Sequence, residues 1–287
     1  MSKIISSILV GLGQKLPPSW RVALTQLPAA NWLRRISLLP FAHGLVTADL
    51  DGPLIGYQMR LDMRAGHRRF ALGTYEPEVA ALIQSMLKSG NTVLDIGANI
   101  GYFTLLMAHL VGSKGRVIAF EPYLPVYSLL QENLLLNNLT WVQAECLAVA
   151  DVAGEARMQS DQTNPLSFVT HLSEKGDLVV STTSVDKYLE SRKLSGLDFI
   201  KIDVEGAEDA VIRGMSRTLG SLRPVVLVEI HANDGGESET LNRLKENGYH
   251  LRHLEQDGWT TCDTRARVGH VLAEIGYFEI HKWPEGL

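Results

Sequence analysis

The sequence predicts an α/β fold in which a mostly parallel β-sheet is doubly wound, with helices on both faces. From Asn91 onward, short runs rich in Val, Ile and Leu alternate with longer segments of helical periodicity, which is typical of repeated strand–helix units. Strands this apolar suit a sheet that is buried on both faces. Each of these runs ends in an acidic residue, so polar groups should collect at one edge of the sheet.

Five strands and four helices form the regular part of the predicted domain. The strands are expected at 92–96, 116–120, 141–144, 198–202 and 225–230, and the helices at 100–110, 124–137, 206–219 and 237–247. Another helix should follow Pro77 and end near Gly90. Residues 150–196 should hold an inserted hairpin and a short helix, and residues 249–254 and 277–283 an antiparallel pair that completes a seven-stranded sheet.

The first 75 residues form an N-terminal extension in this prediction, and residues 76–287 form the α/β domain. Four prolines, at positions 17, 18, 28 and 40, divide the extension into short helices, and residues 55–61 suggest a strand or hairpin. Apolar residues at helical spacing between positions 3 and 15 predict one of these helices. It could lie on a membrane surface or a partner, or pack on its own domain, which we favour.

The composition is that of an ordinary globular protein. The 287 residues are 45% hydrophobic and 21% charged, with a net charge of −5 and no run rich in Lys or Arg, so nucleic-acid binding is not expected. Cys146 and Cys262 lie far apart without metal-binding spacing, which indicates a reducing, cytoplasmic location. No apolar stretch is long enough to span a bilayer.

The turn at residues 93–101, Val-Leu-Asp-Ile-Gly-Ala-Asn-Ile-Gly, has the pattern of a nucleoside-cofactor site. An apolar strand breaks into a glycine turn that opens a helix, and twenty residues after Gly101 a second strand ends in Glu121, a carboxylate suited to ribose hydroxyl groups. The turn is Asp-x-Gly-x-x-x-Gly rather than Gly-x-Gly-x-x-Gly, and Asp95 would repel a pyrophosphate. Because Asp95 suits an amino group and a sulfonium charge, S-adenosylmethionine (SAM) is expected instead of a dinucleotide.

The residues expected to bind this cofactor lie in the turn and at the ends of the next two strands. They are Asp95, Gly97, Ala98, Asn99, Gly101, Glu121, Pro122 and Cys146. Gly97 and Gly101 should let the backbone approach the methionine part of SAM, and Glu121 should accept hydrogen bonds from the ribose. Residues 145–148 should flank the adenine, with Cys146 as a small apolar contact rather than a nucleophile, since the sequence supplies no base for it.

A second polar cluster is expected where the fourth and fifth strands end. Strand alternation puts Asp203 and Glu205 on one side, and the next strand supplies Glu229 and His231 on a shared side. Neighbouring strands are about 4.8 Å apart, so the four side chains can share one site. His231 is the only one of the nine histidines placed in this way, and the others are expected at the surface. Glu208 is interpreted as an acid that stabilises the start of the following helix.

These segments together resemble the FkbM family of SAM-dependent methyltransferases. The resemblance is carried by Val-Leu-Asp-Ile-Gly-Ala-Asn-Ile-Gly-Tyr-Phe-Thr (93–104), Val-Ile-Ala-Phe-Glu-Pro (117–122), Asn133, Asn137, Ala-Val-Ala-Asp-Val-Ala-Gly (148–154), Ser-Val-Asp-Lys-Tyr-Leu (184–189), Ile-Lys-Ile-Asp-Val-Glu-Gly-Ala-Glu (200–208) and Leu-Val-Glu-Ile-His (227–231). It covers about residues 75–280. It implies a class I, Rossmann-like methyltransferase fold and methylation of a hydroxyl group on a small molecule, a sugar or glycolipid, or a polyketide. Residues 1–75 would then choose the acceptor.

Methyl transfer to a hydroxyl oxygen needs an aligned acceptor and removal of its proton. We expect His231 to accept that proton because histidine titrates near neutral pH, while Asp203, together with Glu205, orients it or contacts the acceptor. In the alternative, Asp203, Glu229 and His231 hold a divalent cation, Mg²⁺ or Mn²⁺, that acidifies the acceptor oxygen. This arrangement would be similar to that of catechol-type O-methyltransferases. The sequence leaves both mechanisms open.

Two other classes of protein share part of this pattern. A dinucleotide-dependent oxidoreductase would have the same sheet and Glu121, but it should carry a second glycine where Asn99 stands. An inactive SAM-binding or partner-binding module would share the first half of the domain. It would not be expected to keep acids and His231 at the later strand ends. A methyltransferase is therefore preferred.

Overall fold

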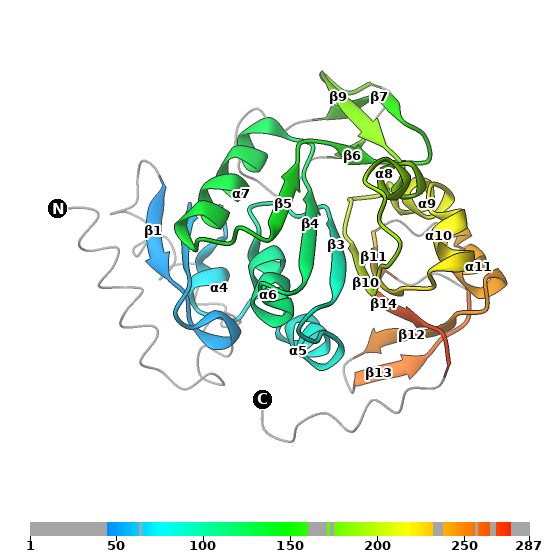
Figure 1. Cartoon of the computed structure of the whole chain (residues 1–287), viewed down its shortest axis with the longest axis horizontal. Helices are drawn as coiled ribbons and strands as arrows, with labels where there is room; N and C mark the ends of the chain where they lie inside the picture. Colours follow the sequence, from blue (N-terminus) through cyan, green and yellow to red (C-terminus); the bar gives the residue numbers. More distant parts are fainter. Residues whose placement is uncertain are drawn as a thin grey trace.

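The computed structural model describes residues 45–62, 65–159, 171–172, 175–231, 238–255, 258–264 and 268–276. The helix predicted between residues 3 and 15, the proline-containing segment after it and the strand predicted at 277–283 lie outside these residues. Within them, a central sheet is covered by helices on both faces (Figure 1).

The central sheet has eight described strands in the order β13-β12-β14-β11-β10-β3-β4-β5. Five are parallel to one another and correspond to the predicted strands: β3 (Thr92–Ile96), β4 (Arg116–Phe120), β5 (Val142–Glu145), β10 (Phe199–Ile202) and β11 (Val225–Ile230). Three are antiparallel: β12 (His250–Glu255), β13 (Gly258–Thr261) and β14 (Gly269–Glu274). The mostly parallel sheet of the prediction is therefore confirmed.

The antiparallel edge differs from the predicted seven-stranded sheet. β14, which the sequence analysis did not predict, lies between β11 and β12 and pairs with both. Leu272 packs into one half of the core, and Val271 and Ala273 pack into the other, as a strand between two neighbours requires. β13 adds an eighth strand beside β12.

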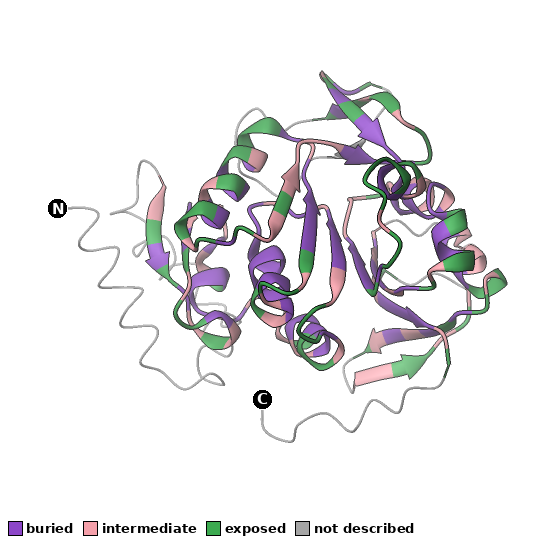
Figure 2. Ribbon diagram, viewed as in Figure 1, coloured by how far each residue is buried: buried purple, intermediate pink, exposed green. Residues whose placement is uncertain are grey.

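Successive residues of the parallel strands enter different halves of the core. Val93 and Val117 pack in the half covered by α5 (Pro77–Met86), α6 (Tyr102–Val111) and α7 (Leu124–Leu136). Leu94 and Ile118 pack in the half covered by α8 (Val185–Ser191), α9 (Glu208–Arg213), α10 (Ser216–Ser221) and α11 (Glu239–Glu246). The middle strands are therefore buried along their length, as Figure 2 shows in purple.

The helix predicted at 206–219 is two short helices, α9 and α10. They meet at Gly214, where an added Cβ would lie 2.2 Å from the carbonyl oxygen of Ala150. The carbonyl of Gly214 also accepts a hydrogen bond from the amide of Asp186 (3.1 Å). Because so close an approach of two backbone segments excludes a side chain, the tertiary contact breaks a helix that the apolar pattern predicts as continuous.

The described part of the N-terminal extension packs on the α/β domain. β1 (Val46–Asp49) and β2 (Gln58–Leu61) form an antiparallel pair, with the 3₁₀ turn η2 (Gly52–Leu54) between them and α4 (Arg68–Ala71) after them. The amide of Arg60 donates to Asn133 Oδ1 (2.6 Å), and Asn133 Nδ2 donates to the carbonyl of Ile100 (2.8 Å). One asparagine of α7 thus ties the extension to the predicted cofactor turn.

The insertion between β5 and β10 is a small four-stranded sheet rather than one hairpin. Its order is β6-β9-β7-β8, with β6 (Ala148–Val149), β7 (Gly154–Gln159), β8 (His171–Leu172) and β9 (Leu178–Thr183).

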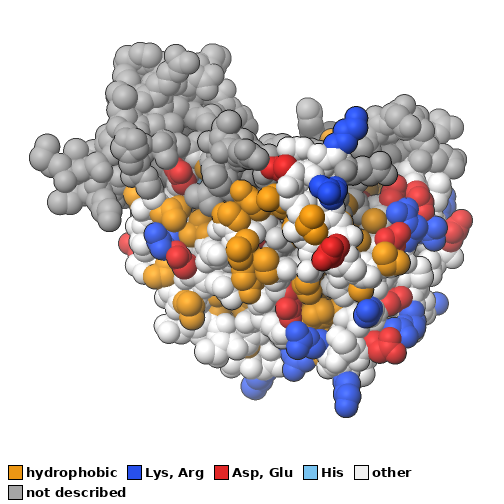
Figure 3. All heavy atoms as spheres, turned by 90° about the horizontal axis from the view of Figure 1, so that it is seen from above, with side chains coloured by type: hydrophobic (Ala, Val, Ile, Leu, Met, Phe, Trp, Pro, Cys, Tyr) orange, Lys and Arg blue, Asp and Glu red, His pale blue; other side chains and the backbone are white. Residues whose placement is uncertain are grey.

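The surface of the described residues is uneven in character. Seen from above, hydrophobic side chains gather near its centre, and many charged side chains lie on one side of it (Figure 3). Among the described residues no helix has the length and apolar character to cross a bilayer.

Candidate active site

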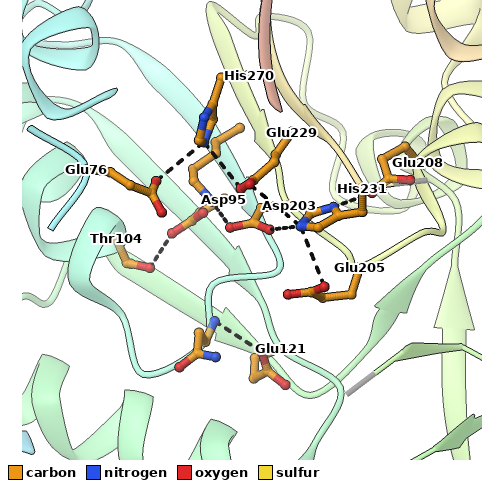
Figure 4. Close-up of polar contacts among 12 residues, drawn as sticks. Glu76, Asp95, Thr104, Glu121, Asp203, Glu205, Glu208, Glu229, His231 and His270 are labelled. Carbon is orange, nitrogen blue, oxygen red and sulfur yellow. Dashed lines mark hydrogen bonds and ion pairs between the residues drawn. The ribbon is translucent and has the colours of Figure 1, made fainter. Parts of the chain in front are cut away.

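A cavity of about 180 Å³ opens at the carboxyl ends of β3, β4, β10 and β11. Its lining includes Asp95, Gly97, Ala98, Asn99, Glu121, Pro122, Asp203, Glu205, Glu229 and His231. Two residues expected at the cofactor, Gly101 and Cys146, are not part of the lining. The two polar clusters of the sequence therefore meet in one cavity (Figure 4), at the edge where open α/β sheets bind ligands.

The turn after β3 passes against the end of β10. Gly97 has a φ of 82°, and a Cβ there would lie 1.7 Å from the carbonyl oxygen of Asp203. The amides of Gly97 and Ala98 both donate to the carbonyl of Phe120 (3.0 and 2.9 Å). Gly101 is the residue before α6 and packs on Leu130. Gly97 therefore provides the close backbone approach, whereas Gly101 serves the start of the helix.

Glu121 is 5% exposed, and two backbone amides hold its carboxylate. Asn99 donates to Oε2 (3.1 Å) and Tyr123 to Oε1 (2.9 Å). Burial raises the pKa of Glu121 to about 7, although the two hydrogen bonds act in the opposite direction. The ionisation of this acid is therefore sensitive to what occupies the cavity.

Cys146 lies behind the cavity wall. Its thiol is 3.6 Å from the carbonyl oxygen of Pro122. Burial raises the pKa of the thiol, and the charge of Glu121 adds to this effect, so the residue is a thiol rather than a thiolate. The three residues that follow it, 147–149, line the cavity. A contact between this segment and an adenine ring stays a prediction.

Lys201 is a buried cation between two acids. It is 2% exposed, and its Nζ donates to Asp203 Oδ2 (2.9 Å) and lies 5.1 Å from the centre of the Phe103 ring. Burial would lower the pKa of Lys201, but Asp203 and Asp95 raise it above the ordinary value. Burial raises the pKa of Asp95 against the opposing effects of Lys201 and of the Thr104 hydroxyl, which donates to Asp95 Oδ2 (2.5 Å). For Asp203, Lys201 outweighs burial and holds the pKa below its usual range.

The imidazole of His231 lies among four carboxylates (Figure 4). Its Nδ1 is 2.7 Å from Glu208 Oε1. Its Nε2 is 3.5 Å from Asp203 Oδ1, 3.6 Å from Glu205 Oε2 and 3.8 Å from Glu229 Oε1, which is longer than an ordinary hydrogen bond. Nε2 is therefore the ring atom that faces the predicted catalytic acids.

These carboxylates change the pKa of His231. Burial alone would lower it, but the hydrogen bond to Glu208 and the charges of Glu205, Asp203 and Glu229 outweigh burial and raise the pKa to about 9. This value is above the near-neutral pKa expected from the residue type. The carboxylates therefore stabilise the protonated ring, which is the form that results when Nε2 accepts a proton.

Glu208 has a contact that the sequence interpretation did not give it. It lies in the first turn of α9, as expected, but it is 5% exposed and hydrogen-bonded to His231. The chain turns sharply before it, because Glu205 (φ 51°) and Gly206 (φ 97°) have left-handed backbone conformations. The amide of Gly206 donates to Glu208 Oε1 (3.0 Å). This turn, which no apolar pattern reveals, directs Glu208 toward His231.

His270 and Glu76 extend the cluster, and the sequence analysis missed His270. Nε2 of His270, on β14, lies 3.2 Å from Glu229 Oε2 and 3.4 Å from Glu76 Oε2. Its side chain is 12% exposed, and His67 and His253 are also buried. The expectation that the other histidines lie at the surface is therefore wrong for these three. Burial would lower the pKa of His270, but Glu229 and Glu76 raise it to about 9. The apolar run after His270, Val-Leu-Ala, was the available signal for a strand here.

Two groups of side chains in or beside the cavity carry donor atoms suited to a divalent cation. The groups are Asp203 with Glu205 and His231, and Glu76 with Glu229 and His270. Within each group the three donor atoms lie within 4.8 Å of one another. Carboxylate and imidazole donors can serve Mg²⁺, Mn²⁺ or Zn²⁺. Glu229, expected together with Asp203 and His231, belongs to the second group.

Comparison with known proteins agrees with the family resemblance. Residues 95–251 match the family model described as the methyltransferase FkbM domain, a span that includes the glycine turn, Glu121 and the residues around His231. The hexuronic acid methyltransferase AglP of Haloferax volcanii is 27% identical over 208 residues, which are 70% of this chain and 83% of that protein.

Two further proteins, both named as methyltransferase FkbM, are similar to this chain. The 31-O-demethyl-FK506 methyltransferase FkbM of Streptomyces tacrolimicus is 27% identical over 194 residues, which are 57% of this chain and 74% of that protein. Among solved structures, methyltransferase FkbM from Methylobacillus flagellatus KT matches 74% of this chain and 53% of that chain, with 17% identity and a TM-score of 0.43.

Proposed function

Because the chain belongs to the FkbM methyltransferase family, we propose that it is an O-methyltransferase that transfers the methyl group of SAM to a hydroxyl group. One observation carries the proposal: Nε2 of His231, with three carboxylate oxygens within 3.8 Å, shares a cavity with the Gly97 turn and Glu121. A group that can receive a proton thus lies beside a site suited to a nucleoside cofactor.

The residues on one side of the cavity fit SAM. Gly97 leaves no room for a side chain where the backbone turns, and Glu121 presents a carboxylate for the ribose hydroxyl groups. Among the described residues, Oδ1 of Asp95 is buried without a hydrogen-bond partner, and the amino group of SAM would supply one. When bound, SAM supplies a methyl group that its sulfonium charge activates.

On the acceptor side, the residues orient a hydroxyl group and receive its proton. We assign proton acceptance to Nε2 of His231, and Asp203 and Glu205 then stabilise the imidazolium. Lys201 donates to Asp203 Oδ2, which leaves Oδ1 toward the ring. A positioned base of this kind contributes about 10²–10⁴-fold to a rate.

The acceptor class that we propose is a small molecule, a sugar or glycolipid, or a polyketide. Support comes from the two relatives above, of which one is named for a hexuronic acid and the other for 31-O-demethyl-FK506. We further propose that residues 1–75 act as a unit that selects the acceptor. Their described part is tied to the cavity through Asn133, which connects β2 to the turn at Ile100.

A second mechanism for the same reaction uses a divalent cation. Here Asp203, Glu205 or Glu229, and His231 would hold Mg²⁺ or Mn²⁺, which would acidify the acceptor oxygen. The observation that favours it is the spacing around Nε2 of His231, because three carboxylate oxygens at 3.5–3.8 Å are too far for ordinary hydrogen bonds. Such separations are compatible with ligands that share one ion.

The proposed reaction is tested with SAM that carries a labelled methyl group and a panel of hydroxylated sugars, glycolipids and macrolides. We expect label transfer that His231→Ala reduces by at least about 100-fold. Near-normal turnover by His231→Ala would show that the base is assigned wrongly. Calorimetry should detect binding of SAM and S-adenosylhomocysteine but not of NAD, and the reverse preference would favour the oxidoreductase reading.

The cation mechanism needs its own measurement. Extensive dialysis against EDTA should abolish activity, and Mg²⁺ or Mn²⁺ should restore it, if an ion acidifies the acceptor. Activity that survives this treatment, with no gain on adding either ion, would leave His231 as the base.

A further inference from the structure

Glu208 lies outside the cavity lining but contacts the histidine on which the proposed chemistry depends. Its Oε1 is 2.7 Å from Nδ1 of His231, and the residue is 5% exposed. We propose that Glu208 is a positioning residue, which fixes the His231 ring with Nδ1 carrying a proton and Nε2 directed into the cavity. The inference rests on the proposed function, because it matters only if Nε2 meets the acceptor or a cation.

The two edges of the His231 ring face different surroundings. Asp203, Glu205 and Glu229 all lie on the Nε2 side, at 3.5–3.8 Å. Among the described residues, Glu208 is the one side chain that hydrogen-bonds to the ring, and it does so at Nδ1. If this contact is lost, no hydrogen bond from another described side chain holds the ring in this orientation.

The carboxylate of Glu208 is itself held by a second hydrogen bond. The amide of Gly206 donates to the same Oε1 atom at 3.0 Å. A buried carboxylate with a charge-assisted hydrogen bond and a backbone partner has little freedom to move. The amide of Gly206 therefore fixes the carboxylate of Glu208, and this carboxylate fixes the ring of His231.

The same role holds for both mechanisms of methyl transfer. A histidine that acts as a base through Nε2 needs its proton on Nδ1. A histidine that binds a metal through one nitrogen donates the other N–H to a carboxylate, and loss of that carboxylate costs about 10–100-fold in affinity or activity. Glu208 satisfies either requirement from the same position.

A purely structural role is the competing explanation, since Glu208 lies in the first turn of α9. The neighbouring Asp209 offers a matched control. It is the second acid of the same turn, so it places a charge at the start of α9. Its Oδ1 accepts the amide of Thr240 in α11 (2.8 Å) rather than a hydrogen bond from His231. If Glu208 served only the helix, Asp209→Asn and Glu208→Ala would have the same effects.

The experiment uses the full-length protein labelled with ¹⁵N-histidine, in four variants: Glu208→Ala, Glu208→Gln, Asp209→Asn and His231→Gln. The wild type should show a downfield Nδ1 proton that is protected from exchange, and its absence in His231→Gln assigns it. Glu208→Ala should lose this signal. Glu208→Gln should keep it, because the amide oxygen can accept the same hydrogen bond, and Asp209→Asn should keep it as well.

Kinetics provide the second measurement. Glu208→Ala should lower kcat by about 10–100-fold and leave the Kd for SAM unchanged within about twofold, because Glu208 does not line the cavity. Glu208→Gln should recover most of the loss. An unchanged Nδ1 signal in Glu208→Ala, or equal losses in Asp209→Asn, would overturn the positioning role. The NMR measurement needs no acceptor, so a wild type that binds SAM but methylates nothing would contradict the proposed function alone.

Discussion

The carbonyl oxygen of Asp203 occupies the space that a side chain at Gly97 would need, because a Cβ built on Gly97 would lie 1.7 Å from that oxygen. The amide of Asp203 also donates to the carbonyl of Ile96 (2.9 Å). The turn after β3 and the segment after β10 are therefore packed against each other, backbone to backbone. A change in one must move the other, which in the proposed site would couple SAM binding to the placement of Asp203.

Gly97→Ala should therefore disrupt both halves of the site. The added methyl group meets rigid backbone, and the φ of 82° is unfavourable for alanine, so we expect a loss in the free energy of unfolding of at least about 3 kcal/mol. SAM binding should fall below detection by calorimetry. Gly90→Ala is the control, since Gly90 has a similar φ of 95° but nothing within 4 Å of an added Cβ. It should cost only about 1–2 kcal/mol, and equal losses in the two variants would contradict the packing argument.

Lys201→Met should destabilise the protein through the acid it leaves behind. The substitution removes the cation that compensates the partly buried Asp203 and the buried Asp95. Leaving buried acids uncompensated in this way costs about 3–5 kcal/mol. Urea unfolding at pH 7 measures the loss. Adding Asp203→Asn to Lys201→Met should recover part of it, because the uncompensated charge is gone. A loss below about 1 kcal/mol, or no recovery in the double variant, would contradict the prediction. Exposed Lys88→Met is the control and should change stability by less than about 0.5 kcal/mol.

SAM affinity should depend on pH through Glu121. Burial raises the pKa of this acid to about 7, while ribose binding requires the carboxylate. Affinity should therefore be constant well above pH 7 and weaken about tenfold for each pH unit below it, since one unit corresponds to about 1.4 kcal/mol. Calorimetry between pH 5.5 and 8.5 measures the slope. Glu121→Gln should bind weakly with no such slope, and a wild-type affinity independent of pH would refute this assignment.

Much of the cofactor side could be predicted from sequence because it depends on local pattern. The limits of β3, β4 and β11 match the predicted strands residue for residue, since each is an apolar run bounded by turn residues. Parallel strands end at the same edge of a sheet. That rule alone predicts that Asp95, Glu121, Asp203 and His231 lie at one edge, and all four line the same cavity.

The remaining contacts depend on chain paths that no local pattern fixes. His270 reaches Glu229 because β14 is inserted between β11 and β12, a long-range pairing decided by packing on both faces. Glu208 reaches His231 because two left-handed residues, Glu205 and Gly206, redirect the chain. Glutamate is uncommon in that conformation, so the residue type at position 205 does not predict a left-handed turn there.

The contact between Glu76 and His270 yields the last prediction, because it joins the start of α5 to β14. Nε2 of His270 lies 3.4 Å from Glu76 Oε2, and Glu76 has an unfavourable left-handed backbone (φ 39°) that costs about 1–2 kcal/mol. We expect a double-mutant cycle with Glu76→Gln and His270→Asn to give a coupling energy of about 1–3 kcal/mol at pH 6.

This coupling should depend on pH, because the pKa of His270 is raised from about 6.5 when unfolded to about 9 when folded. The contribution of protonated His270 to the free energy of unfolding is therefore complete below pH 6.5 and is lost as the pH rises through 9. Urea unfolding of the four proteins at pH 6 and pH 10 should show the coupling at the lower pH and little at the higher. A coupling of equal size at both values would mean that a neutral contact, rather than an imidazolium, holds Glu76 in place.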